Sequence, residues 1–406
     1  MPEGAEIQRP FWDARLAEAW RAAPIVWLSG VRRSGKTTIA RALPGARFLN
    51  CDLPSVQREL EDPEAFYAGV HSAQVASAAS AASRGAARSA PRSAARAASS
   101  TVVFDEIHRL RDPSAVLKIG ADAFPSLRIL AIGSSTLAAT RKFRDSLAGR
   151  KREVNLQPVL FEELPGFGAD IEKRLLHGGM PQMLLAARPD PGFYSEWLDS
   201  YFARDVAELF RVERRSEFLL LLRLLMRQNG GLATVVNLAK QCGATRPTVL
   251  SWIEAMRITH VIHLLRPFHG NGDAELLKQP KIYGFDTGFV AHENGWSELR
   301  SEERGLLWEN VVLEHLLSRP SQPEVHYWRD KQQREVDFVI PRGRSTVDAI
   351  ECKWDLRRID ARGMKAFRAL YPKGSNYVLS PGVAEPYTRV IDGIELTIAS
   401  PLAIQA

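Results

Sequence analysis

Strand-like apolar runs alternate with stretches of helical periodicity over the first third of the chain. The apolar runs are residues 24–29, 46–50, 101–104 and 127–132, and the helical stretches are residues 36–43 and 53–70. Short apolar runs are typical of buried strands, whereas apolar positions three or four residues apart favour helices. Strands that alternate with helices predict a three-layer α/β domain with a parallel sheet, which we place at residues 1–158.

After residue 161 the pattern becomes mainly helical, first over residues 161–210 and then in shorter elements. The shorter elements are a Leu-rich helix at 217–228, a second helix at 235–241, a third at 248–256 and a hairpin within 261–285. Thr245 is placed to cap the third helix, and Pro247 suits its first turn. We therefore expect a helical lid at 159–215 and a winged helix at 216–290.

Residues 72–100 interrupt the alternation of strands and helices. This stretch is almost entirely Ala, Ser and Arg and contains no acidic residue. Its arginines recur every four residues, at Arg84, Arg88, Arg92 and Arg96, which would align them on one face of a helix. One interpretation is a basic arm for nucleic acid. The other is a disordered, low-complexity insertion, because Gly85 and Pro91 interrupt a helix and few side chains could be buried.

A glycine-rich motif follows the first predicted strand. Residues 30–37 read GVRRSGKT, which fits G-x-x-x-x-G-K-S/T completely and lies between a strand and a helix. The glycines allow the backbone amides to surround a phosphate, and the helix adds its positive end. We expect Lys36 to reach the β- and γ-phosphates of ATP and Thr37 to ligate Mg²⁺. The predicted nucleotide-binding residues are Gly30, Ser34, Gly35, Lys36, Thr37 and Thr38.

An acidic pair ends the predicted strand at residues 101–104. The carboxyl ends of parallel strands are where such sheets bind ligands. We expect Asp105 to hold Mg²⁺ and Glu106 to orient and deprotonate the attacking water. Because Glu follows Asp, water is favoured as the acceptor, which predicts a hydrolase rather than a kinase. The alternative is a pair of capping acids at the strand end.

Three further residues are candidates for contacts with phosphate. Ser134 and Ser135 follow the strand at 127–132 and could contact the γ-phosphate or the attacking water, although turn chemistry would also place serines there. Arg150 could supply positive charge to a phosphate, including one bound by a neighbouring subunit. The alternative for Arg150 is a solvated basic surface.

Polar and apolar positions alternate again near the end of the chain. Residues 335–340 (EVDFVI) and 347–354 (VDAIECKW) predict two strands joined by a turn. Asp337 lies on one face of the first strand, and Glu351 and Lys353 share a face of the second, so the three can converge. Two carboxylates and a lysine suit metal-assisted phosphodiester cleavage with a second Mg²⁺ or Mn²⁺ ion. The alternative is an ion-pair cluster without cleavage.

Composition narrows the class of protein. A chain of 406 residues is too long for one ordinary core, and 45% hydrophobic with 25% charged residues is typical of soluble globular proteins. No apolar run reaches the roughly 18–20 residues of a membrane span, and the first residues lack a signal-peptide core. The cysteines, Cys51, Cys242 and Cys352, lack redox or metal-ligand spacing, so we expect a cytoplasmic protein. The net charge of +7 favours polyanionic partners.

The motifs together resemble a known family. In chain order they read GVRRSGKTT, VVFDEIHRL, ILAIGSS, SLAGR, LQPVLFEE, HGGMPQMLL, YFARDV, KIYGFDTG, WENVVLEHL, YWRDKQQREVDFVI and IECKW. This set resembles bacterial and archaeal AAA-type ATPases that carry a C-terminal domain of unassigned function, and that domain is similar to the PD-(D/E)xK nuclease fold. The resemblance covers nearly the whole chain except residues 72–100.

The resemblance implies an α/β fold with an ASCE-type P-loop core, a helical lid, a winged helix and a restriction-endonuclease-like α/β domain at 300–406. It also implies that Glu309 matches the acidic residue on the first core helix of the RecB-like branch, with Glu314 as the second choice. Glu309, Asp337 and Glu351 would then be the metal ligands of the nuclease-like site, with Lys353 beside them.

Two functions are compatible with these residues. The first is an ATP-driven enzyme that acts on DNA as a motor or remodeller with a nuclease-like domain. The second is a slow ATPase that acts as a signalling switch, binds a protein partner and has an inactive C-terminal domain. Both require ATP and Mg²⁺ and neither requires a membrane. The sequence leaves the number of subunits open, including a homo-oligomer.

Overall fold

A computed structural model describes residues 7–85, 101–133, 147–207, 210, 212–269, 279–319, 324–343 and 345–404. The chain divides into two compact units. The first comprises Met1–Gly30 and Gly35–Leu156, and the second comprises Val31–Ser34 and Gln157–Ala406.

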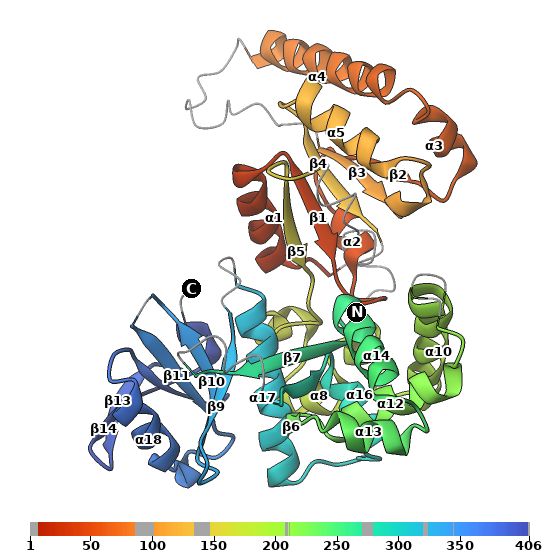
Figure 1. Cartoon of the computed structure of the whole chain (residues 1–406). Coiled ribbons are helices and arrows are strands. Elements are labelled where there is room, and N and C mark those ends of the chain that lie inside the picture. The colour runs from red at the N-terminus through yellow and green to blue at the C-terminus, as the bar shows by residue number, and fades with distance from the viewer. Residues whose placement is uncertain are drawn as a thin grey trace. The chain divides into compact units, whose positions relative to one another are not determined.

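The first unit contains a five-stranded sheet in which every pair of neighbouring strands is parallel (Figure 1). The strands are β1 (Ile25–Ser29), β2 (Arg47–Asn50), β3 (Thr101–Asp105), β4 (Arg128–Ile132) and β5 (Lys151–Asn155). Their order is β2-β3-β4-β1-β5, so β4 lies between the strand that precedes the glycine-rich motif and the strand that ends in Asp105. The predicted parallel α/β sheet is confirmed.

One helix precedes β1, and further helices alternate with the strands along the chain. They are α1 (Pro10–Ala22), α2 (Lys36–Arg41), α3 (Pro54–Glu59), α4 (Pro63–Gly85), the 3₁₀ turn η1 (Ile107–Arg109) and α5 (Pro113–Ala123). Helix α4 continues through the first half of the Ala/Ser/Arg stretch and ends at Gly85. Three of the four periodic arginines, Arg88, Arg92 and Arg96, lie outside the described residues.

The second unit contains helices along its whole length. They are η2 (Phe161–Phe167), α8 (Ile171–His177), α9 (Pro181–Leu185), α10 (Pro191–Tyr201), the π-helical turn η3 (Phe202–Ala207), α12 (Arg215–Arg227), α13 (Val235–Gln241), α14 (Arg246–Ile258), α16 (Thr287–Glu293), α17 (Ser301–Leu317), η4 (Leu356–Arg358), α18 (Arg362–Leu370) and η5 (Pro401–Ala403). The three helices predicted between 217 and 256 are present, and Thr245 Oγ1 accepts the Thr248 amide at 3.3 Å as the expected cap. Within the described residues, none of the helices combines the length and apolar character that a bilayer crossing requires.

A nine-stranded mixed sheet completes the second unit. The strands are β6 (Gly231–Leu232), β7 (Ile262–Pro267), β8 (Lys281–Gly284), β9 (His326–Arg329), β10 (Glu335–Pro341), β11 (Val347–Cys352), β12 (Asn376–Leu379), β13 (Tyr387–Ile391) and β14 (Ile394–Ala399). The order is β13-β14-β12-β11-β10-β9-β7-β8-β6. Strand β7 pairs antiparallel with β8 and parallel with β9, so the hairpin predicted at 261–285 extends the C-terminal sheet.

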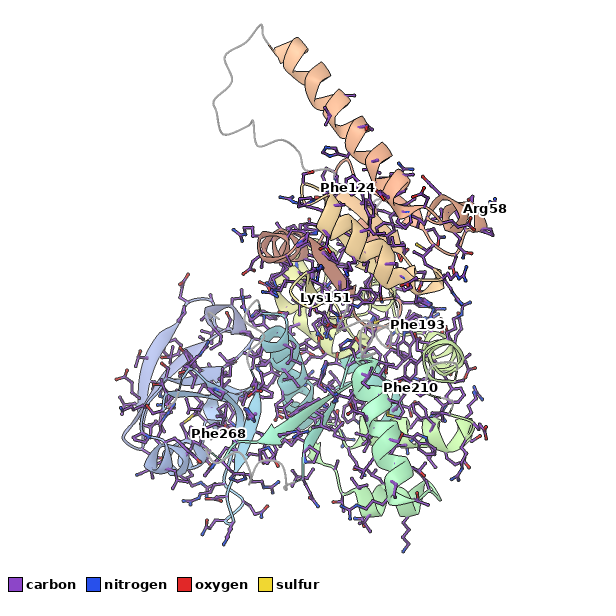
Figure 2. All side chains as sticks on the ribbon, turned by 45° about the horizontal axis from the view of Figure 1, so that its top comes forward. Arg58, Phe124, Lys151, Phe193, Phe210 and Phe268 are labelled. Atoms are coloured by element: carbon purple, nitrogen blue, oxygen red, sulfur yellow. The ribbon has the colours of Figure 1, made fainter. Side chains whose placement is uncertain are left out.

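The core of each unit contains aromatic side chains, and Figure 2 labels Phe124 in the first unit and Phe268 in the second. In the first unit, Phe124 stacks on Tyr67 of α4 with ring centroids 5.6 Å apart. In the second, Phe268 meets Tyr371 edge to face at 5.0 Å. Aromatic pairs of this kind contribute beyond the apolar area that they bury, so the first holds α4 against the end of α5 and the second holds the residue after β7 against the end of α18.

Candidate functional site

The glycine-rich loop joins β1 to α2, as its sequence predicts. Three loop residues have left-handed backbone conformations: Gly30 (φ 136°), Arg33 (φ 63°) and Gly35 (φ 99°). A Cβ atom at Gly30 would lie 2.5 Å from the carbonyl oxygen of Leu156, so no larger residue fits there. Glycine adopts positive φ without a steric penalty, which lets the loop turn sharply before α2 begins.

Two polar contacts organise the end of this loop. Lys36 Nζ donates a hydrogen bond to the Gly30 carbonyl at 2.8 Å, which spans the loop from one end to the other. Thr37 Oγ1 donates to Asp105 Oδ2 at 3.0 Å, although the two residues are 68 positions apart. The structure therefore brings together the hydroxyl and the carboxylate that the sequence assigned to one Mg²⁺ ion.

Glu106 follows β3 in a left-handed conformation, with φ 54° and ψ 41°. This conformation is uncommon for residues other than glycine and costs roughly 1–2 kcal/mol. Its side chain is 43% exposed, and its Oε2 lies 3.3 Å from Nδ1 of His108. Glu106 precedes η1, but among the described residues its side chain caps no amide of that turn. The carboxylate is thus accessible to water beside Asp105.

Cys51 lies next to Asp105 and Glu106, and the sequence did not identify it as part of this site. Its backbone amide donates to the Asp105 carbonyl at 2.9 Å, and its side chain is fully buried. Burial, followed by the charges of Asp105, Asp52 and Glu106, raises the pKa of the Cys51 thiol to about 12. The thiol therefore stays protonated and packs as a small apolar group.

The remaining predicted residues of the first unit have different outcomes. Ser134 and Ser135 lie outside the described residues. Arg150 donates from Nε to Asp122 Oδ1 at 2.6 Å and from its terminal nitrogen to Oδ2 at 3.0 Å. This bidentate contact lowers the pKa of the Asp122 carboxyl. A role for Arg150 at a phosphate would require that it leave Asp122, and such a role stays a prediction.

A pocket of about 310 Å³ adjoins α2 and was not predicted. Its lining combines the segment before α1 and the first turn of α1 with α2 and the residues that follow it: Ile7, Gln8, Arg9, Asp13, Thr38, Ile39, Ala42, Leu43 and Pro44. Burial raises the pKa of the Asp13 carboxyl. The residues before β1 contain no motif, so only the packing of the N-terminal segment beside the loop helix reveals this pocket.

In the second unit, the predicted C-terminal residues lie on adjacent strands. The register of β10 and β11 pairs Phe338 with Ile350, and its continuation by one residue places Asp337 opposite Glu351. Lys353 Nζ donates to Glu351 Oε1 at 2.6 Å. Asp337 Oδ2 accepts the amide of Cys352 at 2.8 Å. The register therefore places Asp337 and Glu351 on one face of the hairpin, as predicted, whereas their convergence with Lys353 on one metal ion stays a prediction.

Glu309 reaches the same cluster from α17 and lies near two residues of β8 that the sequence did not identify. The Tyr283 hydroxyl donates to Glu309 Oε2 at 3.1 Å, and Lys281 forms an ion pair with Glu335. Burial, followed by the nearby charge of Asp337, raises the pKa of Glu309 to about 8. Among the described residues, no group of three or more His, Cys, Asp or Glu side chains is arranged to hold a metal ion.

Glu314, the second choice on α17, belongs to a different network. Its carboxylate pairs with Arg174, whose guanidinium also donates to the Val159 carbonyl and the Thr287 hydroxyl, each at 2.7 Å. Arg174 and Glu314 are both fully buried. A Cβ atom at Gly179 would lie 2.6 Å from Arg174 Cζ, so the glycine of the HGG motif makes room for this guanidinium.

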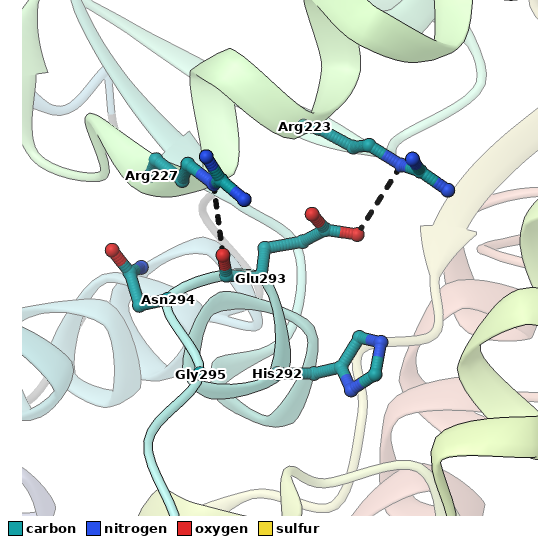
Figure 3. A pocket seen from close by; sticks show the side chains of 6 residues that line it. All are labelled: Arg223, Arg227, His292, Glu293, Asn294 and Gly295. Atoms are coloured by element: carbon teal, nitrogen blue, oxygen red, sulfur yellow. Dashed lines mark hydrogen bonds and ion pairs between the residues drawn. The ribbon is translucent and has the colours of Figure 1, made fainter.

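A second surface pocket, of about 550 Å³, lies between α12 and the end of α16 (Figure 3). Arg227 Nε donates to the Glu293 carbonyl at 2.9 Å, and Arg223 Nε lies 3.6 Å from the Glu293 carboxylate. Arg227 thus satisfies a carbonyl at the C-terminal end of α16, whereas Arg223 pairs with the carboxylate side chain of Glu293. We assign no ligand to this pocket.

Comparison with known proteins divides the chain into three segments. Residues 22–165 match the model of an AAA domain. Residues 168–300 and 304–397 match two domains of unknown function, DUF8612 and DUF4143. Uncharacterized proteins of Mycobacterium tuberculosis and Mycobacterium bovis are each 27% identical over 348 residues, covering 82% of this chain and 71% of theirs. A solved Walker-type ATPase of Pyrococcus abyssi is 16% identical, with a TM-score of 0.43, and covers 71% of this chain and 96% of that one.

Proposed function

We propose that residues 22–165, an AAA-type P-loop domain, bind ATP with Mg²⁺ and hydrolyse the γ-phosphate with water. The observation that carries this proposal is the 3.0 Å contact between Thr37 Oγ1 and Asp105 Oδ2. A hydroxyl after the loop lysine and an acid at a strand end are the protein groups with which P-loop enzymes hold Mg²⁺. When bound, Mg²⁺ neutralises charge on the phosphates.

The neighbouring side chains supply the other parts of the reaction. Lys36, which contacts the Gly30 carbonyl at 2.8 Å, can exchange that contact for the phosphate oxygens. Glu106, with its exposed carboxylate, accepts the proton of the attacking water. The pocket of about 310 Å³ beside Thr38 has the size and mixed lining that suit a base and ribose.

Replacing Lys36 by alanine is expected to lower ATP turnover by at least about 100-fold, because one preorganised donor to a developing charge contributes about that much. Phosphate release by the purified 406-residue chain measures this effect. Lys118→Ala is the matched control, since Lys118 is an exposed lysine of α5 in the same unit. Equal turnover in the Lys36→Ala variant and the unchanged protein would refute the proposed function.

For the second unit, we propose that DNA is bound but not cut. Helices α12, α13 and α14 with hairpin β7–β8 follow the order of a winged helix, and Arg246 is exposed at the start of α14. Lys353 and Lys281 already pair with Glu351 and Glu335, and burial raises the pKa of Glu309 to about 8, which favours its neutral form. The acidic cluster is therefore close to charge balance without a second metal ion.

Duplex DNA is expected to raise ATP turnover several-fold at low salt, and added salt should weaken this effect because phosphate contacts release counterions. Arg246→Ala should reduce the stimulation without altering turnover in the absence of DNA. Mn²⁺-dependent cleavage should be absent in the unchanged protein. Cleavage that disappears in Asp337→Asn would establish the nuclease instead, and turnover indifferent to DNA would favour the signalling switch.

A further inference from the structure

The middle of the phosphate-binding loop packs within the second unit. Residues Val31–Ser34 belong to that unit, while the flanking Gly30 and Gly35 belong to the first. Val31 is 4% exposed and is part of the same apolar cluster as Phe193 and Trp197 of α10. The centre of the phosphate-binding loop is thus held by side chains of α10, which lie outside the P-loop motif.

Helix α10 and the π-helical turn η3 hold two consecutive loop residues. Trp197 Nε1 donates to the carbonyl oxygen of Arg32 at 3.0 Å. Arg32 Nε donates to Asp205 Oδ2, also at 3.0 Å. The guanidinium of Arg33 lies 5.6 Å from the ring centroid of Phe193 and forms an ion pair with Glu196.

The exposed fractions of the side chains show which contacts can hold the loop in one conformation. The Arg32 and Asp205 side chains are 24% and 25% exposed, and Trp197 is fully buried. Glu196 is 68% exposed, so its pair with Arg33 is screened by water and contributes little. A hydrogen bond from a half-buried guanidinium to a carboxylate is stronger than a neutral one and has a defined direction.

The contacts on Arg32 act next to a strained backbone position. Arg33 has φ 63°, a left-handed conformation that residues with a Cβ atom avoid. Trp197 fixes the carbonyl of Arg32 and Asp205 fixes its guanidinium, so the residue before this position is held at both ends. Contacts of this kind maintain a strained conformation that the isolated loop would abandon.

We propose that Asp205 and Trp197 are positioning residues of the nucleotide site: by holding Arg32, they keep the phosphate-binding loop in one conformation before ATP arrives. This inference rests on the proposed ATPase function. A loop that is already ordered binds its ligand more tightly, because the cost of ordering does not reduce the affinity. The apparent Kd scales inversely with the fraction of protein in the competent conformation.

Asp205→Asn is therefore expected to raise the Kd for ATP about 10-fold, the loss expected from one charge-assisted hydrogen bond. Turnover at saturating ATP should change less than about 2-fold, because bound ATP restores the loop. Fluorescence anisotropy of a labelled ATP analogue gives the Kd, and phosphate release gives kcat and KM. Asp205→Glu, which keeps the charge, should recover part of the affinity, and Trp197→Phe should also weaken binding.

Asp199→Asn is the matched control, because Asp199 lies on α10, directly before η3, and pairs with Arg215. Adding Arg32→Ala to Asp205→Asn should not weaken ATP binding further, because both substitutions remove the same contact between Arg32 and Asp205. An unchanged or tighter Kd in Asp205→Asn would overturn the inference, and tighter binding would mean that the carboxylate competes with phosphate. Lys36→Ala distinguishes the two failures: if it also matches the unchanged protein, the proposed ATPase function has failed as well.

Discussion

Glu106→Gln is expected to slow ATP hydrolysis by about 10²–10⁴-fold while ATP remains bound. Glutamine keeps the shape of the side chain but cannot accept the proton of the attacking water. The neighbouring Thr37 and Asp105, in contact at 3.0 Å, are unchanged, so the groups assigned to Mg²⁺ stay in place. The variant should therefore separate binding from chemistry.

A single-turnover measurement with radiolabelled ATP tests this expectation, because it reports the chemical step apart from product release. Retention of ATP on the protein is measured in the same samples. Glu61→Gln is a suitable control, since Glu61 is exposed in the turn before α4. Hydrolysis near the normal rate in Glu106→Gln would show that another group takes the proton, and loss of ATP binding would show that Glu106 holds the nucleotide.

The second large effect concerns stability: Arg174→Met should lower the free energy of unfolding by about 3–5 kcal/mol, the usual cost of breaking a buried ion pair. Arg174 and Glu314 are both fully buried, and the guanidinium also bonds to Val159 and Thr287. Removal of the guanidinium leaves a carboxylate with no cation to oppose it. Arg304→Met is the control, because Arg304 pairs with Glu172 at the surface and should cost no more than about 1 kcal/mol.

This stability loss should depend on pH. Burial raises the pKa of Glu314 to about 7, and Arg174 opposes that rise. A carboxyl with a raised folded-state pKa favours folding fully below its ordinary value of 4.5 and loses this contribution as pH rises through about 7. Without Arg174 the pKa rises further, so the deficit of Arg174→Met should be larger at pH 8 than at pH 5.

Chemical denaturation at the two pH values measures the deficit. Arg174→Met combined with Glu314→Gln should reduce the pH dependence and recover part of the stability, because the Glu314 carboxyl is gone while the buried Asp286 carboxyl near Arg174 remains. A deficit that is equal at pH 5 and pH 8 would contradict the assignment of Glu314 as the titrating group.

The nucleotide site was largely determined by local sequence. Gly30 and Gly35 occupy positions where the backbone has positive φ, and Asp105 ends an apolar strand, so turn chemistry and burial pattern identified both. Thr245 as a helix cap and the antiparallel hairpin of β10 and β11 follow from equally local rules. Strand alternation also fixed which faces Asp337 and Glu351 share, because the side-chain period of a strand is two.

Contacts between distant segments required the tertiary structure. Cys51 meets Asp105 because β2 pairs with β3, and Lys281 and Tyr283 reach Glu309 because β8 packs beside α17. Neither pairing has a signature within a single window of sequence, since parallel strands and helix packing join residues that no short-range periodicity relates. The contacts of Asp205 and Trp197 with Arg32 also depend on the tertiary structure. Each joins residues more than 160 positions apart, which meet only when α10 folds against residues 31–34.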